Sequence, residues 1–183
     1  GHIRDAFDRA DKLNILFVGE TIIDEYRYVA PLAKPSKEFI LATVEAREPE
    51  QFLGGVMAAS LHADWANVSV VPADGDPIKK TRFVDADFGR KLFEVYSKPR
   101  TELSDAQRIA FGTKLDVMSS TADVVIVMDF GHGLLGADDR QFVCENSKFL
   151  AVNAQTNAGN YGFNPITNYD RANLVCIDVP EAR

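Results

Sequence analysis

Carboxylate and amide side chains follow four apolar segments of this chain, and residues of these types can bind a polar ligand. The groups are Glu20, Thr21 and Asp24; Asp129; Asn153, Gln155 and Asn157; and Asp178 with Glu181. Their oxygens and amides can form hydrogen bonds with hydroxyl groups, and carboxylates are also ligands for hard cations. Each group alone is equally typical of a turn or a helix cap. A shared site therefore depends on the elements that carry them.

Apolar segments of strand length alternate with helical patterns along the chain. Strands are predicted at residues 13–18, 68–71, 123–128, 149–152 and 174–177, and the last of these is expected to be buried. Such alternation predicts an α/β fold with a doubly wound, mainly parallel sheet that is covered on both faces. Ligands of these folds bind outside the carboxyl ends of the strands, which is where the four polar groups lie.

Helices are predicted between the strands from apolar spacing and from capping residues. The defining residues are Ile3, Phe7 and Ala10 in a first helix; Ala58, Leu61 and Trp65 on one face of a second, which Gly54 and Gly55 open; and Phe111, Leu115 and Met118 in a third, behind a capping box of Ser104 and Gln107. A fourth helix is expected at about residues 137–147. Another begins at Asp178 and the chain ends one turn later, so we expect a piece of a longer protein or a natural truncation.

A strand-rich part interrupts this alternation. Residues 24–30 and 37–47 are predicted to pair around a turn, away from the main sheet, and residues 81–84 and 92–96 are predicted to be further short strands. The first two residues, Gly-His without a preceding Met, are interpreted as the remnant of a cleaved tag.

The composition is that of one globular domain, with 183 residues, 46% hydrophobic and 26% charged. A net charge of −7 argues against a nucleic-acid partner, because an acidic surface repels a phosphate backbone. Cys144 and Cys176 suggest neither a disulfide framework nor a zinc site, and the sequence lacks a signal peptide and a long apolar run. These features predict a cytoplasmic protein without a membrane partner. No Gly-x-Ser-x-Gly motif is present, which disfavours acyl transfer, and no Gly-x-Gly-x-x-Gly motif follows the first predicted strand, which disfavours classical dinucleotide binding.

Five short motifs occur in a fixed order. They are Val-Gly-Glu-Thr-Ile-Ile-Asp-Glu-Tyr at 18–26, Phe-Leu-Gly-Gly at 52–55, Lys-Lys-Thr-Arg at 79–82, Met-Asp-Phe-Gly-His-Gly at 128–133 and Ile-Asp-Val-Pro-Glu at 177–181. Together they resemble the PfkB (ribokinase-like) carbohydrate kinases. The sequence is most similar to the heptose-phosphate kinase type, including the sugar-kinase halves fused to nucleotidyltransferases. The resemblance covers nearly the whole of this chain, but it corresponds only to the N-terminal part of the kinases in that family.

The resemblance implies a substrate site and a metal site. The substrate-binding residues would be Asp24, Gly54, Gly55, Lys80, Arg82, Asp129, Asn153, Gln155 and Asn157. Asp24 would accept hydrogen bonds from sugar hydroxyls, and Arg82 would bind a sugar phosphate. Asp178 and Glu181 would organise Mg²⁺ near the phosphates of ATP. A loop cap, a tight turn and a solvated strand face are the structural alternatives for these residues.

The sequence departs from the family at several positions. No Asn follows the glycine pair in residues 56–59, Phe130 replaces a Tyr, His132 stands where a Lys is frequent, and Asp178 replaces an Asn. The family's catalytic Asp, in a Gly-Ala-Gly-Asp loop beside the ATP site, has no counterpart. Residues 73–76, Ala-Asp-Gly-Asp, are instead predicted to form a turn.

Residues 3–183 are therefore expected to form a single PfkB-like domain, with a small lid, that lacks the nucleotide-binding half and contains no catalytic residue. The expected function is the substrate-side part of a sugar or sugar-phosphate kinase, inactive alone. The alternative is a non-catalytic module that binds a sugar phosphate or forms a homodimer through an open sheet edge.

Overall fold

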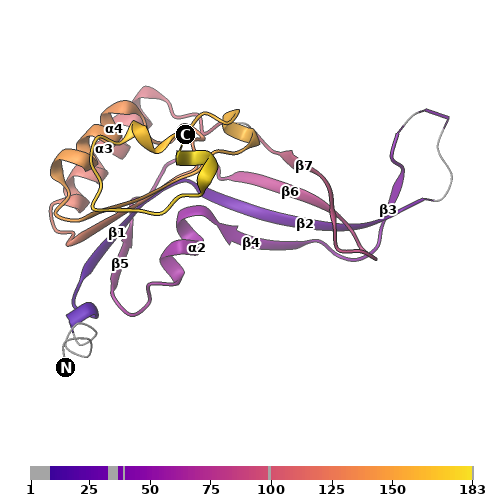
Figure 1. The fold of residues 1–183 in the computed structure, drawn as a ribbon, viewed down its shortest axis with the longest axis horizontal. Coiled ribbons are helices and arrows are strands. Elements are labelled where there is room, and N and C mark those ends of the chain that lie inside the picture. Colours follow the sequence, from indigo (N-terminus) through magenta and orange to yellow (C-terminus); the bar gives the residue numbers. More distant parts are fainter. Residues whose placement is uncertain (1–8, 33–36, 39, 99, 183) are drawn as a thin grey trace.

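The computed structural model describes residues 9–32, 37–38, 40–98 and 100–182, and this part of the chain forms two β-sheets (Figure 1). The main sheet has the strand order β10-β9-β8-β1-β5. Its strands are β1 Asn14–Gly19, β5 Asn67–Val70, β8 Val124–Asp129, β9 Leu150–Ala154 and β10 Leu174–Val175. Each neighbouring pair is parallel, which confirms the predicted sheet.

Helices cover both faces of the main sheet (Figure 1). Helix α2, Gly55–Leu61, lies on one face, and α3, Asp105–Ser119, and α4, Ala137–Asn146, lie on the other. Strand β1 has alternating side chains, and this divides the core into two clusters. Leu16 and Val18 pack in the cluster of α3 and α4, whereas Ile15 and Phe17 pack with α2. The structure is therefore a doubly wound α/β fold, as predicted.

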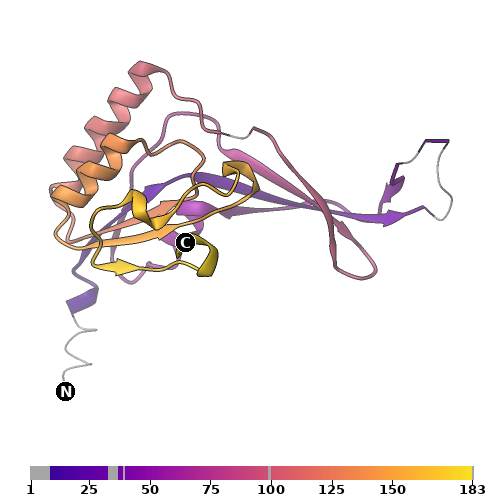
Figure 2. The same cartoon turned by 45° about the horizontal axis from the view of Figure 1, so that its top comes forward.

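The second sheet projects from the body as an arm (Figure 2). Its order is β3-β2-β6-β7, and β4 also pairs with β2. Its strands are β2 Thr21–Pro31, β3 Thr43–Glu45, β4 Glu50–Gly54, β6 Ile78–Asp85 and β7 Lys91–Tyr96. Strands β2 and β6 are parallel, and the other pairs are antiparallel. The predicted strand pair outside the main sheet is confirmed in β2 and β3.

Two local predictions about apolar faces are wrong. Helix α2 ends at Leu61 and buries Val56 and Ser60, while Leu61 and Trp65 are 63% and 52% exposed. The spacing suggested one continuous face, but the helix ends before Trp65. Strand β10 has only two residues and both side chains are exposed, because β10 lies at the sheet edge beyond β9.

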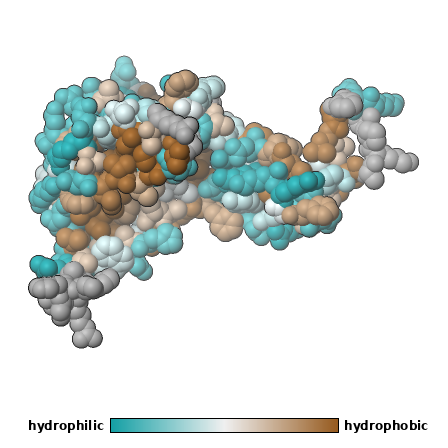
Figure 3. Space-filling model, in the orientation of Figure 1, coloured by the Kyte–Doolittle hydropathy of each residue, from teal (hydrophilic) through white to brown (hydrophobic). Residues whose placement is uncertain are grey.

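Figure 3 shows apolar residues gathered on the face of the body where the C-terminal segment lies.

Three other predicted helices, near the N-terminus, after Ser104 and after Asp178, have different outcomes. The capping box of Ser104 and Gln107 is present at the start of α3, as predicted. Asp178 is followed by a 3₁₀ turn, Val179–Ala182, instead of an α-helix. The helix predicted from Ile3, Phe7 and Ala10 falls largely outside the described residues, of which residues 9–10 are helical. Within the described part of the chain, no helix is long and apolar enough to cross a membrane.

Candidate functional site

A pocket lies between the second sheet and the loops that follow the main-sheet strands. We call it the inter-sheet pocket. It is lined by Ile22, Asp24, Gly55, Lys80, Arg82, Tyr96, Phe130, His132, Gln155 and Asn157. Six of these were predicted as substrate-binding residues, and they come from four separate segments of the chain. The fold therefore gathers into one cavity residues that the sequence placed up to 133 positions apart (24 to 157).

Strand register places the charged wall of the pocket. Asp24 on β2 is opposite Lys80 on β6, and Lys80 is in turn opposite Tyr96 on β7. Arg82 is two residues beyond Lys80 and so projects from the same face, since side chains alternate along a strand. These four side chains, with Tyr26, form a charged and aromatic face.

The cations of this wall already have acidic partners. The Arg82 guanidinium donates to the Asp24 carboxylate and, at 3.3 Å, to the Tyr26 hydroxyl oxygen. The Lys80 ammonium lies 3.3 Å from a Glu94 oxygen and 5.1 Å from the centre of the Tyr96 ring. The Arg82 Nε is buried and has no hydrogen-bond partner among the described residues. A Glu94 oxygen lies 3.8 Å from this Nε, within ion-pair distance but beyond hydrogen-bond distance.

Close packing explains the two glycines before α2. A Cβ on Gly54 would lie 2.5 Å from an Asp24 carboxylate oxygen, and a Cβ on Gly55 would lie 2.1 Å from the Glu20 carbonyl oxygen. Gly55 also has φ +60°, in the left-handed region that favours glycine. Gly54 does not line the inter-sheet pocket, but it leaves the space that the Asp24 carboxylate occupies.

The opposite wall comes from the loops after β8 and β9. The Asn157 amide donates to the Phe130 carbonyl oxygen at 2.8 Å, and its oxygen accepts from the Gly159 and Asn160 amides. Asn157 therefore links the two loops. The Gln155 side chain forms no hydrogen bond with any described residue, so its amide is free to contact a ligand.

Glu20 connects this wall to the second sheet; it belongs to the polar groups that follow the predicted strands, but it is not among the predicted substrate-binding residues. Its carboxylate is 2% exposed and accepts hydrogen bonds from the Phe130 and His132 amides at 3.0 and 3.1 Å. Burial, and then the charge of Asp129, raise the pKa of Glu20 to about 7. The sequence signal for Glu20 is a carboxylate that stands directly between the segments that form β1 and β2.

Asp129 and Asn153 do not line the pocket. Asp129 is fully buried, and its carboxylate accepts from the Arg140 guanidinium at 2.9 Å and the Tyr169 hydroxyl at 2.7 Å. It also accepts from the Gly131 amide at 2.9 Å, so it holds the loop that follows β8. The Asn153 amide donates to the Cys176 carbonyl oxygen at 2.6 Å. Any influence of these two residues on a ligand is indirect in this arrangement.

Asp178 and Glu181 lie beside the loop after β9. Glu181 is 5% exposed, and its two carboxylate oxygens accept from the Thr156 amide at 3.0 Å and the Asp178 amide at 2.8 Å. Burial opposes ionisation of Glu181, but hydrogen bonds from Asp178 and Thr156 hold its pKa below the usual value. The pKa of Asp178 is raised by its hydrogen bond to Glu181.

The family resemblance predicts that Asp178 and Glu181 organise Mg²⁺. Carboxylates are suitable ligands for Mg²⁺, but both Glu181 oxygens already accept backbone hydrogen bonds. No group of three or more His, Cys, Asp or Glu residues in the described ranges is arranged to hold a metal ion. As arranged, the pair joins residues 178–181 to the loop after β9, and its role toward Mg²⁺ stays a prediction.

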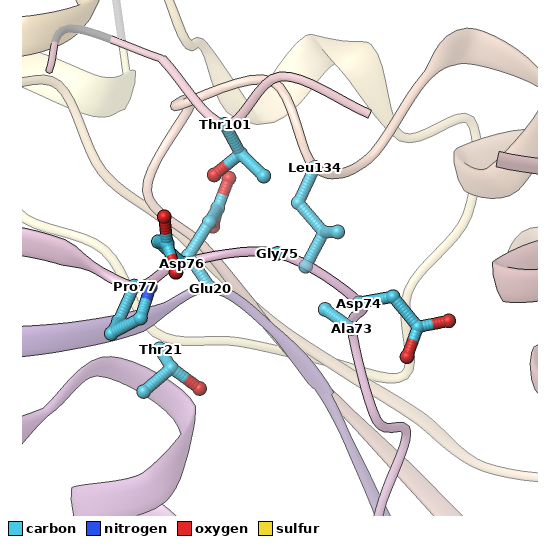
Figure 4. Close-up of a pocket in the computed structure, with 9 residues that line it drawn as sticks. All are labelled: Glu20, Thr21, Ala73, Asp74, Gly75, Asp76, Pro77, Thr101 and Leu134. Carbon is cyan, nitrogen blue, oxygen red and sulfur yellow. The ribbon is translucent and has the colours of Figure 1, made fainter. Parts of the chain in front are cut away.

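A second pocket adjoins Glu20 (Figure 4). It is lined by Glu20, Thr21, Ala73, Asp74, Gly75, Asp76, Pro77, Thr101 and Leu134. Residues 73–76, which were predicted to form a turn, lie in the loop between β5 and β6, which bends at Gly75. Asp74 forms an ion pair with Lys114 at 2.9 Å. Glu20 therefore lies at the boundary between two cavities.

Comparison with known proteins identifies the fold. No family model and no curated protein matches the chain. A possible 1-phosphofructokinase from Thermotoga maritima matches with a TM-score of 0.55 and 11% identity, over 90% of this chain and 60% of that one. Phosphofructokinase-2 from Escherichia coli in complex with fructose-6-phosphate matches with a TM-score of 0.54 and 11% identity, over 80% of this chain and 56% of that one.

The tetrameric inhibited form of the E. coli enzyme matches similarly, with a TM-score of 0.52 and 11% identity over 82% of this chain and 57% of that one. The chain thus spans little more than half the length of these kinases. Its α/β fold matches the ribokinase-like fold of PfkB-family carbohydrate kinases.

Proposed function

We propose that this chain is the substrate-side part of a PfkB-like kinase that transfers a phosphoryl group from ATP to a sugar or sugar phosphate, and that the inter-sheet pocket binds the sugar. The observation that carries the proposal is the convergence of Asp24, Lys80 and Arg82 from the second sheet with Gln155 and Asn157 from the loop after β9. Acceptors, cations and amides in one cavity suit a hydroxylated, anionic ligand.

Each group has a distinct part in binding. The Asp24 carboxylate accepts hydrogen bonds from sugar hydroxyls, and the Gln155 amide can donate or accept at the opposite wall. Arg82 and Lys80 bind the phosphate, and the Nε of Arg82, which forms no hydrogen bond with the described residues, adds a further donor once the side chain moves to expose it. Asp129, Asn153 and Gly54 support these residues from outside the pocket.

The nucleotide is expected to bind elsewhere. Kinases of this class use ATP and Mg²⁺, but the sequence contains no Gly-Ala-Gly-Asp loop. We therefore propose that residues beyond this chain supply the ATP site and the catalytic base. The chain binds and orients the sugar through the residues above.

Isothermal titration tests this division. The 183-residue chain is titrated with fructose 6-phosphate, a heptose phosphate, the unphosphorylated sugars, and ATP with Mg²⁺. We expect the sugar phosphates to bind more tightly than the sugars, and ATP to bind negligibly with no turnover. Mg²⁺-dependent turnover by this chain would overturn the division, and no binding of any sugar phosphate would overturn the assignment of the pocket.

A non-catalytic, dimerising module is the second candidate. It is favoured by β10, a sheet-edge strand whose Leu174 and Val175 are 55% and 43% exposed. An open edge with apolar side chains can pair with another strand. Sedimentation of the wild type and of Val175→Lys distinguishes the two, because edge pairing predicts a dimer that the substitution dissociates.

A further inference from the structure

Glu20 contacts three separate parts of the inter-sheet pocket. Its carboxylate accepts from the amides of Phe130 and His132, whose residues line one wall. Its carbonyl oxygen accepts from the Val56 amide at 2.9 Å, next to Gly55 at the start of α2. Glu20 is also covalently continuous with β2, which carries Asp24. One buried residue therefore ties together the strand, the helix start and the loop that surround the cavity.

The carboxylate form of Glu20 matches the loop better than the acid form does. A carboxylate is an acceptor at both oxygens, so it satisfies both amide donors. A neutral acid carries a hydroxyl hydrogen on one oxygen, which leaves one of the buried amides poorly paired. Loss of either hydrogen bond removes one of the contacts that hold Phe130 or His132 in place, and both residues line the pocket.

Several titratable groups surround Glu20. They are Asp129 at the end of β8, with its partners Arg140 and Tyr169; His132 in the loop itself; and Asp74 and Asp76 across the adjoining pocket (Figure 4). Helix α2 contributes only a backbone amide. Burial and the nearby Asp129 disfavour the charge on Glu20, so its ionisation changes near neutral pH.

We propose that Glu20 is a positioning residue whose ionised carboxylate holds the 130–132 wall of the inter-sheet pocket, so that ligand binding there requires the ionised form. This inference rests on the proposed function only for the identity of the ligand. The contact between Glu20 and the loop can be tested without any ligand.

Amide NMR tests the loop directly. The Phe130 and His132 amide signals are followed from pH 5 to pH 9 in the wild type, Glu20→Gln and Glu20→Asp. We expect the wild-type Phe130 signal to titrate near pH 7, and Glu20→Gln to lose this transition. Phe130 is the decisive probe, since the His132 amide also responds to its own imidazole. An unchanged transition in Glu20→Gln would overturn the proposal.

Binding provides the second readout. Fructose 6-phosphate is titrated at pH 6 and pH 8 into the wild type, Glu20→Gln and a control, Asp85→Asn. Asp85 is a buried carboxylate that also accepts from two backbone amides, of Asp87 and Phe88, but at the outer end of β6. The phosphate of fructose 6-phosphate also changes its protonation between pH 6 and pH 8, but this changes the affinity of all three proteins by the same factor.

The expected pattern is specific to Glu20. Wild type and Asp85→Asn should lose about tenfold more affinity between pH 8 and pH 6 than Glu20→Gln, which binds weakly at both values. Equal pH dependence in all three proteins would overturn the inference. If no protein binds fructose 6-phosphate, the proposed ligand fails, while the amide titration still decides the role of Glu20. Should Glu20→Gln not fold, Glu20→Asp decides instead: the shorter carboxylate should shift the Phe130 transition, and an unchanged transition would overturn the proposal.

Discussion

Asp24 and Arg82 form an ion pair across the parallel strands β2 and β6, although neither is directly opposite the other. Asp24 is in register with Lys80, and Arg82 is in register with Tyr26. The guanidinium therefore reaches back along the sheet face to the carboxylate, and their side chains remain 13% and 24% exposed. A sugar phosphate in the pocket would meet an acceptor and a donor that already orient each other.

The first prediction concerns Asp24→Ala. We expect at least a tenfold loss of affinity for sugars and sugar phosphates, because the acceptor for hydroxyls is removed. Stability should fall by at most about 1 kcal/mol, since partly exposed ion pairs contribute little and Arg82 keeps Tyr26 as a partner. Titration and thermal unfolding measure the two effects. A large loss of stability would assign Asp24 a structural role instead.

The second prediction concerns the contact between Arg82 and the phosphate group of the ligand. Arg82→Lys should weaken sugar-phosphate binding roughly tenfold, because an ammonium cannot form the paired hydrogen bonds of a guanidinium. Affinity for the unphosphorylated sugar should change little. Arg90→Lys is the matched control, since Arg90 stacks near Phe88 outside the pocket. Equal losses for the sugar and its phosphate would argue against a phosphate contact.

The third prediction is that alanine substitutions at Gly54 and Gly55 have different effects. In Gly54→Ala the new Cβ would meet the end of the flexible Asp24 side chain, so we expect displaced Asp24, weaker sugar binding and a small change in stability. In Gly55→Ala the Cβ would meet the Glu20 carbonyl oxygen at a positive φ, so we expect a loss of about 1–3 kcal/mol or more. Urea unfolding combined with titration tests the contrast, which fails if both variants behave alike.

The fourth prediction is the pH dependence of stability. Burial and Asp129 raise the pKa of Glu20 from 4.5 to about 7 in the folded state, so the folded protein binds more protons than the unfolded chain in this window. The contribution of Glu20 to stability is therefore present below about pH 4.5 and is lost as pH rises to 7, by roughly 3 kcal/mol.

Glu20→Gln removes this titration. Relative to the wild type, the variant should therefore gain stability between pH 5 and pH 8, as measured by urea unfolding at both values. A stability difference that does not depend on pH would contradict the raised pKa. The ionised carboxylate would thus lower stability at the same pH at which it is proposed to hold the pocket wall.

Local patterns in the sequence predicted the elements well. The apolar runs of β1, β8 and β9 formed the parallel sheet, and the Ser104 and Gln107 capping box began α3, because each depends on neighbours a few residues away. The weakest predictions were at element ends. The α2 face and the burial of Leu174 and Val175 depended on where a helix stopped and on what lay beyond a sheet edge.

The sequence shows the chemistry-bearing residue types, and it predicts Asp24, Lys80 and Arg82 as binding residues. The tertiary structure decided which of them share a cavity, enclosed Asp129 behind Arg140 and Tyr169, and gave Glu20 its contacts. The decisive hydrogen bonds join residues 58 positions apart for Arg82 with Asp24, and 110 and 112 apart for the loop with Glu20. Local spacing sets backbone conformation, but contacts at such separations arise only when strands pair and bury side chains together.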